Sequence, residues 1–175
     1  MENSELKKEP GMFNAALQYG VLIAIGLAML TIIIYLADLQ DITWLSFIGY
    51  AILLGGLILG TIKYRDEHLG GYISYSKALG FGTFTAFLTA VISAIFTYIF
   101  YTLIAPDALE SLKEAAEIKV LQDYPNATDQ QLDLTRAMVS PLLMTISALF
   151  GYTFLGFIFS LLTSAFFKKT DPLTE

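Results

Sequence analysis

The chain has 175 residues, of which 55% are hydrophobic and 15% are charged, whereas roughly a quarter of the residues in a soluble globular domain are charged. The formal net charge of −6 comes without any basic patch, which argues against nucleic acid as a partner. Because the sequence contains no cysteine, disulfides, thiolate metal sites and cysteine nucleophiles are excluded together. We therefore expect residues 1–175 to form a single integral membrane domain of the all-α class.

Four apolar runs are long enough to cross a bilayer as helices. The first follows a polar stretch with lysines, as a signal peptide would, but the apolar core of a signal peptide has only about 7–15 residues and ends at a small-residue cleavage site. Here the run continues to Tyr35 and Leu36 before Asp38, which favours an uncleaved span. The four predicted spans are residues 15–37, 44–62, 76–105 and 140–167.

The third span is the longest of the four. Residues 78–105 contain no charged side chain, and at about 1.5 Å per residue they would extend roughly 40 Å, against a hydrocarbon core of about 30 Å. Lys77 precedes this stretch and Pro106 follows it. We expect the helix to be tilted or to project beyond the bilayer on one side.

The one substantial polar region, residues 107–136, separates the third and fourth spans. Apolar residues at helical spacing predict a first helix, which Pro125 ends. Thr128 and Gln131 match a capping box and predict the start of a second helix. We expect a helical hairpin outside the bilayer that leads into the fourth span, where Pro141 either starts the helix or kinks it.

The basic residues predict the orientation, because the cytoplasmic side of a membrane protein carries the excess of lysine and arginine near its spans. With four spans, both termini and the loop between the second and third spans share one side. We expect that side to be the cytoplasm and the acidic hairpin to lie outside. The shared side holds Lys7, Lys8, Lys63, Arg65, Lys77, Lys168 and Lys169, and the other side holds Lys113, Lys119 and Arg136.

Two segments resemble a known group of proteins. Residues 71–78 (GYISYSKA) open the third span, and residues 138–141 (MVSP) open the fourth after a polar helical segment. With the hydropathy of nearly the whole chain, they resemble an uncharacterised family of small bacterial four-span membrane proteins, a domain of unknown function. The resemblance implies a four-span topology in the bacterial inner membrane, and it implies no activity.

Small residues recur every four positions on the first, second and fourth spans. Because lipid gives helices no hydrophobic reason to associate, small residues that allow close backbone approach are the usual contact points. Such faces serve packing within one chain or between copies, and the sequence leaves both open. We expect Leu57 to lie off the face that Gly56 and Gly60 form on the second span. The candidate packing residues are Gly20, Ala24, Gly55, Gly56, Gly60, Gly151 and Gly156.

Hydroxyl side chains form a stripe along the third span. Thr85, Thr89, Ser93 and Thr97 are four residues apart, and Tyr101 continues the series, so they share one helix face. The stripe would line a path for a small solute, or its hydroxyls would bond to carbonyls four residues earlier and pack against neighbouring helices. No charged residue lies on the stripe, which favours packing. A water-filled cavity around Thr89 and Ser93 would favour the path.

The sequence offers no set of residues that catalysis or metal binding requires. His68 is the only histidine, whereas zinc sites use three or four ligands, and no nucleophile–base–orienter set can be assembled around it. We expect no catalytic residue, no metal and no cofactor. The favoured function is a non-catalytic module in the lipid bilayer that associates with itself or with an envelope protein. The alternative is a channel or carrier for a small uncharged solute.

Overall fold

The structure, a computed structural model, describes residues 11–39 and 42–169. Lys7 and Lys8, which contribute to the predicted orientation, lie outside these ranges. Within them, extended pairing is limited to an isolated antiparallel bridge between Ile73 and Lys169. The elements in chain order are α1 (Met12–Leu36), a 3-10 helix η1 (Thr43–Leu45), α2 (Ser46–His68), α3 (Tyr75–Ile99), a π-helix η2 (Phe100–Ile104), α4 (Pro106–Asp123), α5 (Asp129–Met138) and α6 (Pro141–Phe167).

The prediction of an all-α chain with four membrane spans is confirmed. The described residues include four helices that are long and apolar enough to cross a membrane. The largest difference in their bounds is at the end of the second span, which continues past Ile62 because the polar residues that follow stay helical. An ion pair of 3.0 Å between Lys63 and Glu67, one turn apart, supports that extension. The four helices are Met12–Leu36, Phe47–His68, Tyr75–Ile104 and Pro141–Phe167.

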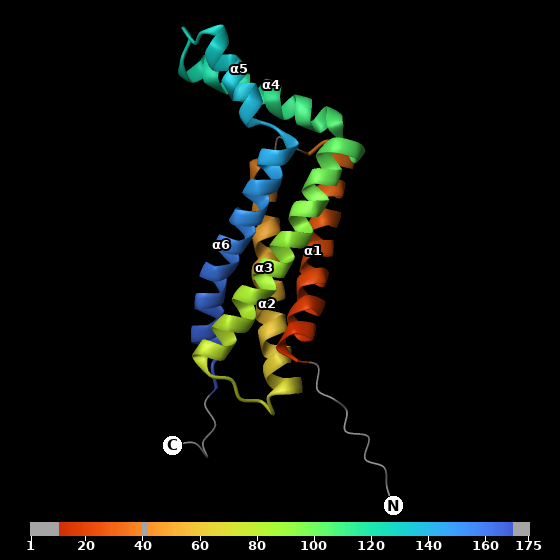
Figure 1. The fold of residues 1–175 in the computed structure, drawn as a ribbon, viewed down its shortest axis with the longest axis vertical. Helices are drawn as coiled ribbons and strands as arrows, with labels where there is room; N and C mark the ends of the chain where they lie inside the picture. The colour runs from red at the N-terminus through yellow and green to blue at the C-terminus, as the bar shows by residue number, and fades with distance from the viewer. Residues whose placement is uncertain (1–10, 40–41, 170–175) are drawn as a thin grey trace, which may run out of the picture.

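Figure 1 shows the four spans side by side, with α4 and α5 beyond one end of the bundle. The start of α1, the end of α6 and the loop between α2 and α3 lie at the opposite end. That loop turns on Gly70 and Gly71, whose φ angles of 65° and 89° suit glycine. Ile73 and Lys169 then exchange two backbone hydrogen bonds of 2.9 Å, which join the loop to the residues after α6.

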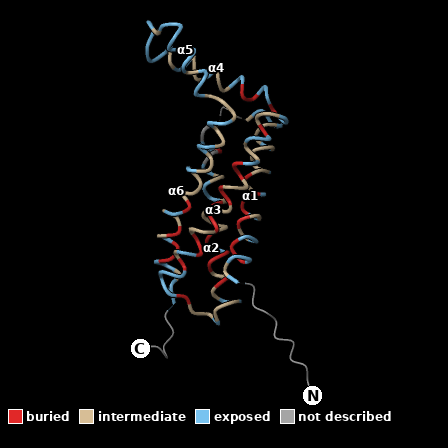
Figure 2. Tube along the Cα trace, viewed as in Figure 1, coloured by how far each residue is buried: buried red, intermediate tan, exposed pale blue. Residues whose placement is uncertain are grey.

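The third span lies at the centre of the bundle. α3 packs most extensively against α6 and then against α1. Phe81 of α3 stacks on Tyr64 of α2, with 4.3 Å between the ring centroids, and Gly82 lies against Ser160 of α6. The buried residues of α6 all lie in its second half, from Gly156 onward, so the spans pack most tightly at the end away from α4 (Figure 2).

The third span ends in a wider turn. After Ile99 the chain continues as the π-helix η2, in which the N–H of Ala105 donates to the carbonyl of Phe100 at 2.8 Å. Pro106 follows as the first residue of α4, where its missing N–H leaves no hydrogen bond unmade. The chain therefore turns from the span into α4 without a loop. Single π-turns within helices occur frequently at functional sites.

α4 and α5, called the arm below, run beside each other beyond the bundle (Figure 1). Glu117 of α4 and Arg136 of α5 form an ion pair between the two helices. The predicted capping box starts α5, since the Gln131 side chain accepts the N–H of Thr128 at 2.9 Å. At the other end of the arm, Ala108 is buried in the first turn of α4 and packs in a cluster with residues of the spans.

Pro141 starts α6 and does not kink a longer helix. Val139 has left the helical conformation, with φ −95° and ψ 79°. Ser140 is extended, and its Oγ accepts the N–H of Leu143 at 3.4 Å, so it acts as the N-cap. The alternative that the sequence left open is resolved by this break between α5 and α6.

Candidate functional site

The hydroxyl stripe of α3 is packed along its first half. Thr85 and Thr89 are fully buried. The Thr85 hydroxyl donates to the Phe81 carbonyl at 2.8 Å, and the Thr89 hydroxyl donates to the Thr85 carbonyl at 2.9 Å. Thr89 also reaches the Gly20 carbonyl of α1 at 3.3 Å. These hydroxyls are satisfied by backbone carbonyls, so this half of the stripe lines no space.

From Ser93 onward, the hydroxyls of the stripe no longer bond to backbone carbonyls of the described residues. The Oγ of Ser93 is buried and has no hydrogen-bond partner among the described residues. One turn later, Thr97 lines a cavity, and Tyr101 of η2 lines the same cavity. The stripe therefore meets open space only at its arm end, one turn or more away from the Thr89 and Ser93 positions where a solute path would need it.

Most of the predicted packing residues are points where two helices approach closely. A Cβ at Gly156 of α6 would collide with Ala86 of α3. One at Gly82, which the sequence pattern did not single out, would lie 2.6 Å from the Ser160 hydroxyl. Ala24 is buried on α1. The other close approaches are Gly20 against Leu88, Gly56 against Ile23 and Gly60 against Tyr19.

Gly55 and Gly151 differ from these positions, because a Cβ on either would meet no atom within 4 Å. Gly151 lines the cavity that Thr97 reaches, whereas Gly55 does not. Leu57, which was expected to lie off the face of Gly56 and Gly60, is fully buried all the same and packs in a cluster with Ile23 and Ala86. The reason is that α2 contacts α1, α3 and α6, so more than one of its faces is covered.

A cavity of about 380 Å³ lies between the spans near the arm. Binding sites for small molecules range over about 300–1,000 Å³, so the volume suits one. All four spans contribute polar side chains, and η2 adds one more. The hydroxyl-bearing residues of the lining are Thr31 of α1, Tyr50 of α2, Thr97 of α3, Tyr101 of η2, and Ser147 and Tyr152 of α6.

The hydroxyls of this cavity are largely free to bind. The Thr31 hydroxyl donates to the Leu27 carbonyl at 3.0 Å, while the other five make no hydrogen bond with the residues that the structure describes. Phe96, Phe100 and Leu155 supply apolar walls. Among the described residues, the lining contains no carboxylate, amine, guanidinium or imidazole group. Each free hydroxyl offers a donor and an acceptor, so the arrangement suits an uncharged ligand that can hydrogen-bond.

A smaller cavity of about 200 Å³ continues toward the arm and shares Thr31, Phe100 and Tyr101 with the first. Its far wall includes residues of α4. The Tyr35 hydroxyl of α1 donates to the Asp107 carboxylate of α4, at 2.9 and 3.0 Å from its two oxygens. This bond holds the first turn of the arm over the end of the cavity.

The sequence alone does not predict which residues come together around the cavity. Thr31, Tyr50, Ser147 and Tyr152 come from three different helices, and no pattern within one segment relates them. The one signal was the arm end of the hydroxyl stripe, where Thr97 leads to the Tyr101 of η2. The π-turn that follows has no sequence signature of the kind that marks a cap or a proline start.

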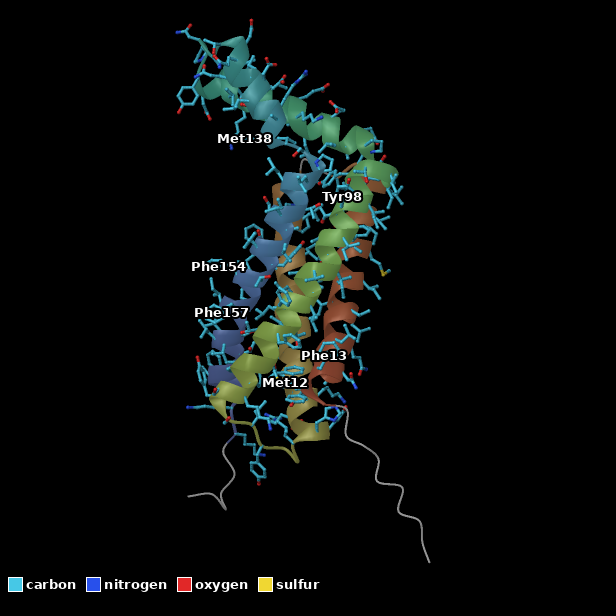
Figure 3. All side chains as sticks on the ribbon, viewed as in Figure 1. Met12, Phe13, Tyr98, Met138, Phe154 and Phe157 are labelled. Atoms are coloured by element: carbon cyan, nitrogen blue, oxygen red, sulfur yellow. The ribbon has the colours of Figure 1, made fainter. Side chains whose placement is uncertain are left out.

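The outer part of the arm exposes apolar side chains. Polar neighbours are partly paired: Lys113 lies 2.7 Å from Glu110 and holds the pKa of that carboxyl below its usual range. Glu114 and Asp133 form no ion pair with the described residues. Figure 3 labels Met138 at the end of α5, just before the chain enters α6. The exposed apolar residues of the arm are Ile118, Leu121, Tyr124, Leu134 and Met138.

The opposite end of the bundle holds the only histidine. His68 lies beside Tyr64, with 5.7 Å between the ring centroids. Arg65 pairs with Asp66 at 2.7 Å and donates to the carbonyl of Phe167 at 3.4 Å, which ties α2 to the end of α6. In the described parts of the chain, no group of three or more His, Asp or Glu side chains could hold a metal ion.

Four apolar helices around an uncharged cavity, with two further helices beyond the bundle, define an α-helical, multi-pass membrane protein. The family model described as "Protein of unknown function (DUF4199)" matches residues 18–169, and the chain belongs to this family. The predicted resemblance to an uncharacterised family is thereby confirmed. Comparisons with curated proteins and with solved structures found no match.

Proposed function

We propose that this protein is a non-catalytic membrane protein that associates with an envelope protein through its arm. The observation that carries the proposal is the set of exposed apolar side chains on α4 and α5, outside the helices that are apolar enough to cross a membrane. Exposed apolar patches with polar surroundings often mark interaction sites. Ala108 and the bond between Tyr35 and Asp107 attach the arm firmly enough to present this surface.

The charge of the arm favours a basic partner. Acidic residues outnumber basic ones, so two arms placed face to face would bring like charges together, and anionic lipid would be repelled as well. A protein surface with an apolar centre and a rim of lysine or arginine complements the arm in both respects. The acidic residues are Asp107, Glu110, Glu114, Glu117, Asp123, Asp129 and Asp133, and the basic residues are Lys113, Lys119 and Arg136.

Catalysis and transport have less support than association. Among the described residues, the lining of the 380 Å³ cavity contains no carboxylate, imidazole or amine, the groups that most often act as general acids and bases or activate a nucleophile. A channel or carrier would need a path along the stripe, but Thr85 and Thr89 are bonded to backbone carbonyls and covered by neighbouring helices.

We further propose that the protein lies in the bacterial inner membrane with both termini in the cytoplasm and the arm outside. The basic residues Lys63, Arg65, Lys77, Lys168 and Lys169 all flank span ends away from the arm, as cytoplasmic residues do. Single cysteines at residues 4 and 175 should be protected from an impermeant thiol reagent in intact cells, while one at residue 126 should react. Labelling of the termini with protection of the arm would invert the orientation.

Site-specific photocrosslinking tests the association. A benzophenone amino acid placed at Leu134 in the full chain, in its own cell membranes, should give one discrete adduct with a second protein. The double variant Glu114→Lys and Asp133→Lys should abolish this adduct, because it reverses charges on the proposed surface. Glu117 is left unchanged, since its ion pair with Arg136 supports the arm itself.

The matched control places the same benzophenone at Phe166, which is exposed on the α6 surface away from the arm and should yield only lipid adducts. An adduct at twice the chain mass would show that the arm binds a second copy. If no adduct forms at Leu134, or if a short Gly-Ser linker replaces the arm without consequence, the arm is only a connector.

A further inference from the structure

The 380 Å³ cavity has its mouth within the depth of the bilayer. Of its lining residues, Tyr50 on α2 is 41% exposed and Ser147 on α6 is also exposed. Both lie early in their spans, which begin at Phe47 and Pro141. At about 1.5 Å per residue, the mouth is roughly 5–10 Å below the ends of these helices, where headgroups meet acyl chains.

The other end of the cavity is closed. Leu155 is the lining residue of α6 farthest from the arm, and Gly156 next to it is in contact with Ala86 of α3. Below that contact, Ser160 lies against Gly82, so the two helices leave no passage. The cavity therefore stops at this contact and does not continue to the other end of the bundle, which makes the space a binding site and not part of a path across the membrane.

We propose that this cavity binds an uncharged glycerolipid of the diacylglycerol class, drawn laterally from the bilayer. The five hydroxyls that make no hydrogen bond with described residues match the hydroxyl and ester carbonyls of such a headgroup, since each can donate or accept. The described lining contains no charged group, which disfavours phosphate-bearing lipids, because their buried charge would have no partner. Phe96 and Phe100 provide apolar surface for the first carbons of the acyl chains, which continue into the bilayer through the mouth.

Photolabelling of the full chain in nanodiscs tests this assignment. The nanodiscs would consist of phosphatidylcholine doped with diacylglycerol that carries a diazirine near its ester groups. Peptide mass spectrometry should locate adducts on cavity residues such as Tyr101, Met144 and Tyr152. Diazirine-bearing phosphatidylglycerol and phosphatidylcholine, used in parallel, should label only the exposed outer faces of the spans.

Two glycines provide a matched pair of variants. Gly151→Leu places a side chain into the cavity, and because a Cβ there meets no atom within 4 Å, the helices need not move to admit it. Gly55→Leu makes the same substitution at a position that is equally open but outside the cavity. Diacylglycerol labelling of the cavity should be lost in Gly151→Leu and retained in Gly55→Leu.

A second variant tests the hydrogen bonds separately from the shape. Tyr101→Phe combined with Tyr152→Phe keeps the volume of both side chains and removes two hydroxyls, so cavity labelling should fall while thermal stability in detergent stays the same. This variant also decides the matter if Gly151→Leu fails to fold.

Three results would overturn the proposal. They are equal cavity labelling by all three lipids, undiminished labelling in both the Gly151→Leu and the Tyr101→Phe/Tyr152→Phe variants, and loss of labelling when free glycerol is added. The last result would identify the occupant as a water-soluble polyol and not a lipid.

Discussion

Both halves of the bundle carry small residues on α6, but these residues lie in a close helix contact in one half and border a cavity in the other. Away from the arm, Gly82, Gly156 and Ser160 bring α3 and α6 into close contact. Nearer the arm, Ser147 and Gly151 repeat the same four-residue spacing on α6, yet they border a cavity. A small residue allows a close approach but does not produce one, because the opposite helix must also present a small surface.

Aromatic side chains account for the open half. The cavity is lined by Phe96, Phe100, Tyr101 and Tyr152. In the packed half, the contacts between α3 and α6 are instead made by the small residues Gly82 and Ala86 of α3. Phe100 lies 5.8 Å from Phe96 and 5.2 Å from Tyr101 between ring centroids, so large rings take the place that small residues have in the packed half. We therefore expect the packed half to contribute most of the stability of the bundle, while the open half provides space for binding.

The largest effect is expected in the packed half. Gly156→Ala should lower the free energy of unfolding in mild detergent by about 1–3 kcal/mol, since the new methyl group collides with that of Ala86. Denaturation by SDS titration would measure the change. Adding Ala86→Gly removes the colliding methyl and should recover part of the loss. If the double variant is no more stable than Gly156→Ala alone, the contact between these residues does not limit packing.

A smaller contrast is expected along the hydroxyl stripe. Thr89→Val should cost about 0.5–1 kcal/mol of unfolding free energy, because the Thr89 hydroxyl bonds to carbonyls of Thr85 and Gly20. Thr97→Val keeps the side-chain volume and breaks no hydrogen bond among the described residues, so its unfolding free energy should stay within about 0.3 kcal/mol of the parent. Equal losses in the same SDS titration would contradict the division of the stripe.

The smallest effect is expected at the cavity glycine, with the opposite sign. Gly151→Ala should raise the unfolding free energy by roughly 0.5 kcal/mol, because alanine loses less backbone entropy in a helix and its methyl meets no atom within 4 Å. Thermal unfolding in detergent would detect the shift. A destabilisation of the size expected for Gly156→Ala would mean that the two halves of α6 are packed alike.

Local features of the sequence were enough for much of the fold. The four spans follow from uncharged runs longer than a bilayer needs, and the capping box at Thr128 and Gln131 forms as its spacing predicts. Only the structure shows that α6 starts at Pro141, because the pair Ser140 and Pro141 is compatible both with a helix start and with a kink in a longer helix. The cavity could be found only in the structure, since its hydroxyls come from separate helices and one of them belongs to the π-helix η2.

The sequence by itself determined what can be read along a single helix: length, polarity, caps, and which faces carry small or hydroxyl residues. Only the tertiary structure decided what those faces meet. Gly56 and Gly156 meet another helix, Gly151 meets open space, and Leu57 is buried although it belongs to no small-residue face. The physical reason is that helix contact in a membrane depends on shape complementarity between two surfaces, whereas the sequence of one segment determines the surface of that segment alone.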